Sequence, residues 1–130
     1  MNRIVLDASA ALAVFFGEAG GEVVEPVLFG ATMSAVNYSE VLKKAIEKGG
    51  DHVIAQGFLE RQAINIVPFD AAHAVSAAVL LPHTAPLGLS FADRACVSLG
   101  MKLGYAILTA EKRMSEVPVK VSVKLIRKKK

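Results

Sequence analysis

The stretch LGLSFADRACVSLGMKLGYAILTAE, residues 87–111, predicts a helix, a turn and a strand in succession. Ser90 is a typical helix-capping residue, so we expect a helix to begin there with Asp93 in its first turn. A glycine after the helix predicts the turn, and the apolar run Tyr105–Leu108 predicts a short buried strand. Glu111 follows that strand. The stretch therefore places two carboxylates near one edge of the sheet that the strand joins.

The rest of the chain alternates short apolar runs with amphipathic stretches. The predicted strands lie within residues 3–6, 30–34, 65–68, 105–108 and 119–126, the last as an edge strand. Before the helix at Ser90, the predicted helices cover residues 10–16, 18–29, 35–48, 51–63 and 71–81, followed by a loop over 82–88. This order predicts an α/β fold, a three-layer sandwich in which helices flank a mostly parallel central sheet of four to five strands.

Periodicity assigns an apolar face to two of these helices. The residues expected to face inward are Val41, Leu42, Ala45 and Ile46 in the first, and Val53, Ile54, Phe58 and Leu59 in the second. The three histidines, His52, His73 and His83, lack the spacing of zinc ligands and are expected on the surface or on a helix face. The single cysteine, Cys96, is expected to be a small buried residue.

Length and charge indicate one domain with a basic tail. The chain has 130 residues, enough for one substantial core, so we expect a single domain over residues 1–126 and a solvated tail over 127–130. Fifteen Lys and Arg residues face twelve Asp and Glu residues, but four of the fifteen are in the tail, so the body is nearly neutral. Because Asp7 interrupts the first apolar run, no signal peptide or membrane span is expected, which favours a soluble, cytoplasmic protein.

Four acidic residues are expected to meet at one edge of the sheet. Right-handed crossovers place all strand-to-helix junctions at the carboxyl edge of a parallel sheet, where ligands bind. Asp7 ends the first strand, and Glu40 lies in the first turns of the helix after the second strand. Asp93 lies in the first turn of its helix, and Glu111 follows the fourth strand.

Each of these residues also has a purely structural interpretation. Asn37 with Glu40, and Ser90 with Asp93, match the spacing of a capping box. Glu40 could instead pair with Lys44 one turn later. In the same way, Asp7 and Glu111 could simply favour the N-terminus of a helix.

Taken together, the four carboxylates favour a metal site. Carboxylates that share one edge repel one another, and a divalent cation removes that repulsion. Mg²⁺ and Mn²⁺ prefer oxygen ligands. We expect Ser9, Asn37 and Thr109 to support the site as hydrogen-bonding neighbours.

Three segments of the sequence resemble PIN-domain nucleases. They are VLDASAAL (5–12), SAVNYSEVLKKA (34–45) and LGLSFADRACVSLGMKLGYAILTAEKRM (87–114), in the family's order and over nearly the whole chain. The chain looks most like the VapC-type toxins of type II toxin–antitoxin pairs. The resemblance implies a PIN-like fold and a metal-dependent endoribonuclease that uses one or two Mg²⁺ ions, with Mn²⁺ as a substitute.

The resemblance also carries over a set of catalytic, metal-binding residues, namely Asp7, Glu40, Asp93 and Glu111. The family usually has Asp at the fourth position, so Glu111 is a departure. The expected products of RNA cleavage carry a 5′-phosphate and a 3′-hydroxyl. Basic residues around the site would bind the RNA; the candidates are Lys43, Lys44, Arg94, Lys112 and Arg113.

The resemblance further implies protein partners, namely a cognate antitoxin and a second copy of the chain in a homodimer. The main alternative is a degenerate PIN domain that binds RNA or protein without catalysis. An aspartyl-nucleophile phosphatase is disfavoured, because that chemistry usually places a second Asp at position 9, where this chain has Ser9. A 5′-nuclease acting on DNA would usually need more acidic residues and helical arches than 130 residues accommodate.

Overall fold

The computed structural model describes residues 3–128 and is built around a five-stranded sheet. The strands are β1 (Ile4–Leu6), β2 (Thr32–Ser34), β3 (Asn65–Val67), β4 (Ala106–Thr109) and β5 (Val123–Leu125). Their order is β3-β2-β1-β4-β5, and every neighbouring pair is parallel. The predicted parallel sheet is confirmed, and β5 lies at its edge as expected.

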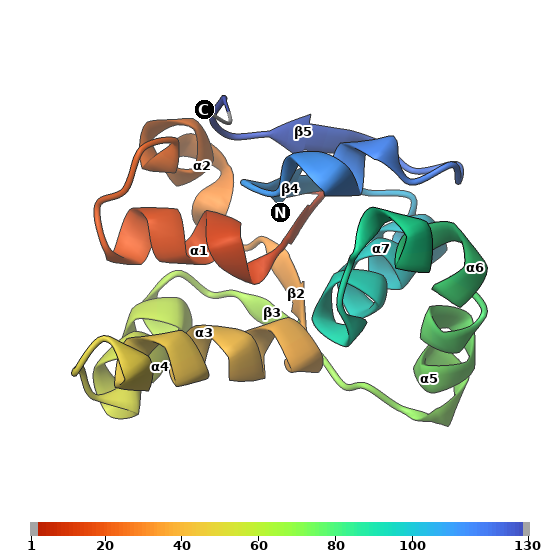
Figure 1. Ribbon diagram of the computed structural model, residues 1–130. Coiled ribbons are helices and arrows are strands. Elements are labelled where there is room, and N and C mark those ends of the chain that lie inside the picture. Colours follow the sequence, from red (N-terminus) through yellow and green to blue (C-terminus); the bar gives the residue numbers. More distant parts are fainter. Residues whose placement is uncertain (1–2, 129–130) are drawn as a thin grey trace.

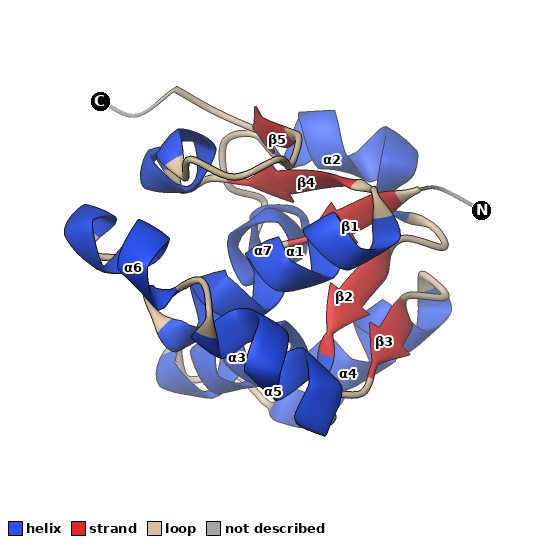
Figure 2. Ribbon diagram, turned by 90° about the vertical axis from the view of Figure 1, so that its right-hand side faces the viewer, coloured by secondary structure: helices blue, strands red, loops and turns tan. Residues whose placement is uncertain are grey.

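Helices cover both faces of the sheet (Figures 1 and 2). They are α1 (Ala8–Phe15), α2 (Gly21–Leu28), α3 (Ala35–Glu47), α4 (His52–Arg61), α5 (Ala71–Ala78), α6 (Leu81–Thr84) and α7 (Phe91–Leu103), with 3₁₀ turns η1 (Ala85–Leu87) and η2 (Lys112–Glu116). Helices α1 to α4 contribute to one hydrophobic cluster, and α7 contributes to the other.

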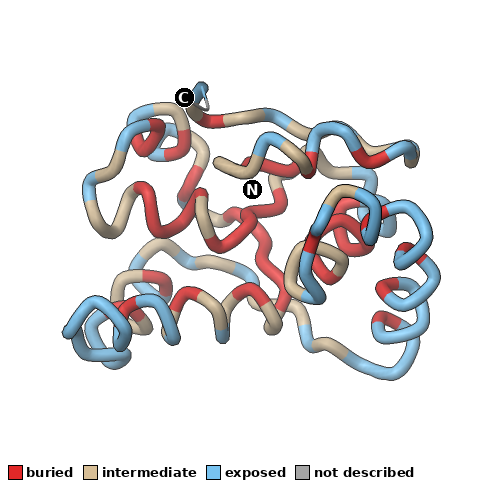
Figure 3. The backbone as a smooth tube through the Cα atoms, in the orientation of Figure 1, coloured by how far each residue is buried: buried red, intermediate tan, exposed pale blue. Residues whose placement is uncertain are grey.

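The two clusters follow from the alternation of side chains along the central strands. In β1, Val5 belongs to the α7 cluster and Leu6 to the cluster of α1 to α4; in β4, Ile107 and Leu108 divide in the same way. Successive residues of a strand point to opposite faces, and here both faces are buried. Figure 3 shows the buried backbone gathered through the middle of the molecule. The predicted three-layer sandwich is therefore confirmed.

The helix and strand predicted within residues 87–111 lie against each other. Ser90 caps α7, and Gly104 ends it in the left-handed conformation with φ of 68°. At Gly100 a Cβ atom would stand 2.7 Å from the side chain of Ile107, so only glycine permits this close approach of α7 to β4. Cys96 is buried in α7 as expected.

Several predicted element boundaries were wrong. Helix α1 begins at Ala8, with Asp7 in the N-cap position and Ser9 inside the helix. The predicted loop over 82–88 contains most of α6 and all of η1, and α5 ends at Ala78. Prolines fit the first turns of these short elements because an N–H at that position has no helical partner.

The predicted inward faces were also partly wrong. Ile46 on α3 is 55% exposed. Val53 and Ile54 on α4 are 58% and 61% exposed, because α4 turns Ala55 and Leu59 to the core instead. Of the two positions expected for the histidines, His73 takes a helix face: it lies on α5 and is buried, with its Nε2 3.0 Å from the carbonyl oxygen of Ala95.

The predicted tail begins with an ordered contact. Arg127 donates from Nη1 to the carbonyl oxygen of Ala19 at 2.8 Å and lies 3.6 Å from a carboxylate oxygen of Glu18. The last two lysines of the tail and the first two residues of the predicted domain lie outside the described residues. Within residues 3–128, no helix is long and apolar enough to cross a bilayer.

Candidate active site

A pocket of about 340 Å³ lies at the carboxyl edge of the sheet, between the first turns of α1, α3 and α7. Its lining residues are Asp7, Ala8, Ser9, Leu12, Asn37, Glu40, Lys44, Ser90, Ala92, Asp93 and Glu111. All four predicted carboxylates therefore line one pocket. A larger pocket, of about 560 Å³, lies around Tyr105 at the opposite end of β4 and has no acidic residue in its lining.

Asp7 is the most buried carboxylate of this pocket. It is 6% exposed, and its Oδ2 accepts hydrogen bonds from Ser9 Oγ at 2.7 Å and Thr109 Oγ1 at 2.7 Å. Burial raises the pKa of the Asp7 carboxyl, because the charged form loses its water. The two hydroxyl donors oppose that rise, and the negative charge of Asp93 adds to it.

The same two hydroxyls tie the end of β4 to the start of α1. Ser9 Oγ accepts a hydrogen bond from the backbone N–H of Ala110 at 2.9 Å, and Thr109 Oγ1 accepts one from the N–H of Glu111 at 3.0 Å. The orientation of the Asp7 carboxylate is thus fixed by residues more than 100 positions away as well as by its own helix. Ser9 and Thr109, which the sequence analysis expected as hydrogen-bonding neighbours of the site, thus both contact Asp7.

Asp93 takes part in a capping box at the start of α7. Ser90 Oγ accepts from the N–H of Asp93 at 3.3 Å, and Asp93 Oδ2 accepts from the N–H and the hydroxyl of Ser90 at 2.8 and 3.0 Å. The structural interpretation of this spacing is therefore correct. The cap uses only Oδ2 of the carboxylate, and Asp93 still lines the pocket.

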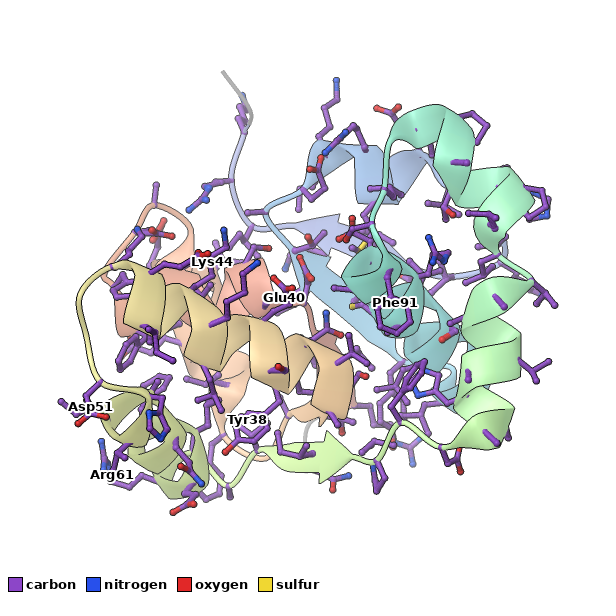
Figure 4. The ribbon with its side chains drawn as sticks, turned by 60° about the horizontal axis from the view of Figure 1, so that its bottom comes forward. Tyr38, Glu40, Lys44, Asp51, Arg61 and Phe91 are labelled. Carbon is purple, nitrogen blue, oxygen red and sulfur yellow. The ribbon has the colours of Figure 1, made fainter. Side chains whose placement is uncertain are left out.

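On α3, the capping box that the spacing of Asn37 and Glu40 allowed is absent. Ser34 caps this helix by accepting from the N–H of Val36 at 3.2 Å. Asn37 is fully buried and donates from Nδ2 to the carbonyl oxygen of Ala92 at 3.1 Å, which joins α3 to the start of α7. Its Oδ1 is buried and has no hydrogen-bond partner among the described residues. Glu40 lies on the side of α3 that faces α7 (Figure 4).

Glu111 is held by a neighbouring arginine. Arg113 donates from Nη2 to Oε1 at 2.7 Å and from Nε to Oε2 at 3.1 Å, and its N–H donates to Oε2 at 2.9 Å. The hydrogen bond to Glu111 raises the pKa of Arg113. Arg113 Nη1 also donates to the carbonyl oxygen of Leu87 at 3.1 Å, so this pair joins η2 to the segment before α7.

The predicted basic rim is only partly assembled. Lys44 lines the pocket, and its Nζ lies 3.6 Å from a carboxylate oxygen of Glu47 rather than pairing with Glu40. Lys43 also lies near Glu47, at 3.9 Å. Lys112 is exposed. Arg94, beside Asp93, lies with its guanidinium 5.8 Å from the centre of a phenylalanine ring.

One basic residue was missed by the sequence analysis. Lys48, together with Phe16 and Glu18, lines a second pocket of about 220 Å³ that shares Ser9, Leu12 and Lys44 with the first. Its Nζ lies 4.6 Å from the centre of the Phe16 ring. The helical spacing of Glu40, Lys44 and Lys48 would have identified it, because residues four apart share a helix face.

The oxygen donors that line the pocket are of the type that a hard divalent cation binds. In this structure they do not converge on one point. Within residues 3–128, no three acidic, histidine or cysteine side chains stand close enough to hold a metal ion. Two of the four carboxylates have other partners, since Asp93 contacts Ser90 and Glu111 contacts Arg113. The carboxylate set, with the unpartnered Oδ1 of Asn37, has the chemistry that Mg²⁺ and Mn²⁺ require.

The comparisons with known proteins agree with this fold. The PIN domain family model matches residues 4–120. No curated protein matches the chain in sequence.

Several solved structures share the fold at low sequence identity. A toxin–antitoxin complex from Klebsiella pneumoniae has a TM-score of 0.74 at 15% identity, covering 95% of this chain and 98% of that one. DNA-bound VapBC from Salmonella typhimurium has 0.74 at 14% identity, covering 98% and 100%. The sarcin–ricin loop cleaving toxin VapC20 from Mycobacterium tuberculosis has 0.74 at 17% identity, covering 92% and 98%. With the family match over most of its length and the parallel five-stranded fold, this chain belongs to the PIN domain family.

Proposed function

We propose that this protein is a metal-dependent endoribonuclease and the toxin of a toxin–antitoxin pair. One observation carries the proposal. The buried carboxylate of Asp7, whose pKa is raised, shares a pocket at the carboxyl edge of the sheet with Glu40 and Asp93. A buried carboxylate beside other acidic groups is a frequent mark of a functional site. The fold similarity to VapC20 supports RNA as the substrate class.

Asp7, Glu40 and Asp93 would hold one or two Mg²⁺ or Mn²⁺ ions. When bound, the metal would lower the pKa of a water molecule, which would supply hydroxide as the nucleophile for a phosphodiester, and would offset the charge of the phosphate. Ser9 and Thr109 would keep the Asp7 carboxylate oriented through their bonds to its Oδ2. Asn37 would keep the starts of α3 and α7 together through its bond to Ala92.

Glu111 is assigned a supporting role in this proposal. Both of its carboxylate oxygens accept hydrogen bonds from Arg113, which also holds the segment before α7. The pair would position the end of α7 that carries Asp93. Lys44, in the pocket wall, would contact the phosphate backbone of the RNA.

We propose a cognate antitoxin and a second copy of the chain as partners in the cytoplasm. The solved complexes of similar fold, among them VapBC assemblies, support an antitoxin. The pocket beside Phe16, Glu18 and Lys48 adjoins the acidic pocket and offers a place where such a partner could approach it.

A non-catalytic RNA- or protein-binding domain is the second candidate. It is favoured by two contacts, the capping box that engages Asp93 and the Arg113 side chain that engages Glu111. In that case the two carboxylates would serve the fold alone.

Cleavage of single-stranded RNA in Mn²⁺ by the Glu40→Gln variant separates the two candidates. Loss of a direct metal ligand should reduce the rate by more than the roughly 10–100-fold typical of outer partners. Glu60→Gln, an exposed carboxylate on α4 outside the pocket, is the matched control and should cleave like the wild type. A wild type that cleaves no RNA would favour the non-catalytic alternative. A Glu40→Gln variant as active as the wild type would contradict the assignment of Glu40 as a metal ligand.

A further inference from the structure

Phe91 is an exposed aromatic residue at the edge of the acidic pocket. It is the first residue of α7, and its side chain is 49% exposed. Its two neighbours in sequence, Ser90 and Ala92, both line the pocket, as does Asp93. Figure 4 shows Phe91 at the start of α7, on the same side of the molecule as Glu40 on α3.

The ring is held in place from the side of α5. Phe91 meets Phe69 edge to face, with centroids 5.3 Å apart and ring planes at 87°. Phe69 in turn lies 4.5 Å from the ring of His73, which is buried and bonded to the backbone of α7. The exposed side chain is therefore fixed by a row of aromatic rings, and a ligand that contacted it would not have to order it.

A positive charge accompanies the ring. The guanidinium of Arg94 lies 5.8 Å from the centroid of Phe91. Within residues 3–128, no carboxylate forms an ion pair with Arg94, and its Nε is buried without a hydrogen-bond partner. A partly exposed aromatic ring beside a guanidinium that has no ion pair within residues 3–128 can bind an unpaired nucleobase, since every base has a π-face and the backbone next to it is anionic.

We propose that Phe91 and Arg94 form a stacking site for an unpaired base of single-stranded RNA next to the acidic pocket. The inference rests on the proposed function for its choice of RNA, but it concerns binding and needs no bound metal. The stacking site favours substrates whose bases are unpaired near the cleaved bond, because a base inside a duplex cannot stack on a protein ring. It therefore contributes to the selection of loops and single strands over helices.

The chain has no tryptophan, so Phe91→Trp creates a single fluorescent reporter within the site. The experiment uses the full chain in EDTA, which prevents cleavage. A 12-nucleotide single-stranded RNA should quench the fluorescence of this variant, and the same sequence in a perfect duplex should quench it less. An abasic oligomer of the same length tests charge without bases and should also quench less. Phe29→Trp, which replaces a 63% exposed phenylalanine outside the pocket, is the control and should show no such difference.

Affinity provides the second measurement. Phe91→Ala should weaken binding of the single-stranded RNA about five- to tenfold, at the lower end of base stacking, and Phe91→Tyr should restore it. Equal quenching by the single strand, the duplex and the abasic oligomer would overturn the stacking site. An unchanged RNA affinity of Phe91→Ala, with altered self-association in sedimentation, would overturn it in favour of a protein interface.

The outcome is separable from that of the proposed function. If the wild type cleaves no RNA but Phe91→Trp shows the single-strand-specific quenching, the nuclease proposal fails and the stacking site stands. If the wild type cleaves RNA while Phe91→Ala binds it with unchanged affinity, the nuclease stands and the stacking site fails.

Discussion

The carboxylate of Asp7 is shielded from water and accepts hydrogen bonds from two hydroxyl groups. This environment determines its pKa. Ser9 and Thr109 both donate to the same oxygen, Oδ2. Those bonds only partly offset the loss of hydration, so the pKa is raised from its ordinary value of 3.8. The negative charge of Asp7 therefore destabilises the metal-free folded state. A bound cation would offset that destabilisation.

Asp7→Asn tests this cost through the dependence of stability on pH. Because the folded state binds the Asp7 proton more tightly than the unfolded state, the free energy of unfolding falls as pH rises from about 4 through the raised pKa. An asparagine oxygen can accept both hydroxyls without charge. In EDTA, Asp7→Asn should be more stable than the wild type at pH 7, and the difference should shrink toward acid pH.

Urea unfolding of both proteins across pH 4 to 8 gives the measurement. Ser115→Ala, an exposed change outside the pocket, controls for the general effect of substitution. A wild type that is as stable as Asp7→Asn at pH 7 would contradict the account of Asp7.

At the scale of elements, Arg113 connects η2 with the segment that leads into α7. Its guanidinium bonds to Glu111 and to the carbonyl oxygens of Leu87 and Gly88. Arg113→Gln should loosen this segment, which hydrogen exchange would detect as faster exchange of the amides of residues 87–93. Lys112→Gln, an exposed neighbour, should leave exchange unchanged. Equal amide exchange rates of residues 87–93 in the two variants would contradict the positioning role of Arg113.

The close approach of α7 to β4 gives a second prediction at this scale. Gly100→Ala places a Cβ 2.7 Å from Ile107 and should destabilise the fold by about 1–3 kcal/mol. Gly57→Ala, inside α4, meets only the mobile end of Arg61 at 3.2 Å and should be neutral or stabilising by up to about 1 kcal/mol. Thermal unfolding compares the two. A stable Gly100→Ala variant would mean that the helix lies farther from the strand.

The local signals of the sequence identified most elements but not their long-range contacts. Ser90 and Gly104 marked both ends of α7, because caps and left-handed turns depend on neighbouring residues alone. The bond of Asn37 to Ala92, 55 residues away, depends on how two helices pack. The burial of His73 likewise depends on α7, and no periodicity within α5 predicts it.

At the scale of the whole molecule, strand order determines which residues meet. In the order β3-β2-β1-β4-β5, the central strands β1, β2 and β4 all point their carboxyl ends to the same edge. Carboxylates separated by up to 104 positions in sequence, from Asp7 to Glu111, therefore line one pocket. The sequence predicted this convergence because parallel topology requires it. It did not predict that Ser90 and Arg113 would engage two of the four carboxylates.

The central claim is that Asp93 acts in catalysis as well as in the cap of α7, and two substitutions separate these roles. Ser90→Ala removes the capping hydroxyl and keeps the carboxylate, whereas Asp93→Asn keeps an acceptor for the Ser90 N–H and removes the charge. Loss of the cap should cost about 0.5–2 kcal/mol of stability.

The decisive measurement is the rate of RNA cleavage in Mn²⁺ by these two variants, each shown to be folded. The account predicts that Ser90→Ala keeps cleavage within about tenfold of the wild type. Asp93→Asn should lose more than the roughly 100-fold expected for an outer partner of a metal. Wild-type cleavage by a folded Asp93→Asn variant would contradict the assignment of this pocket as a metal-dependent nuclease site.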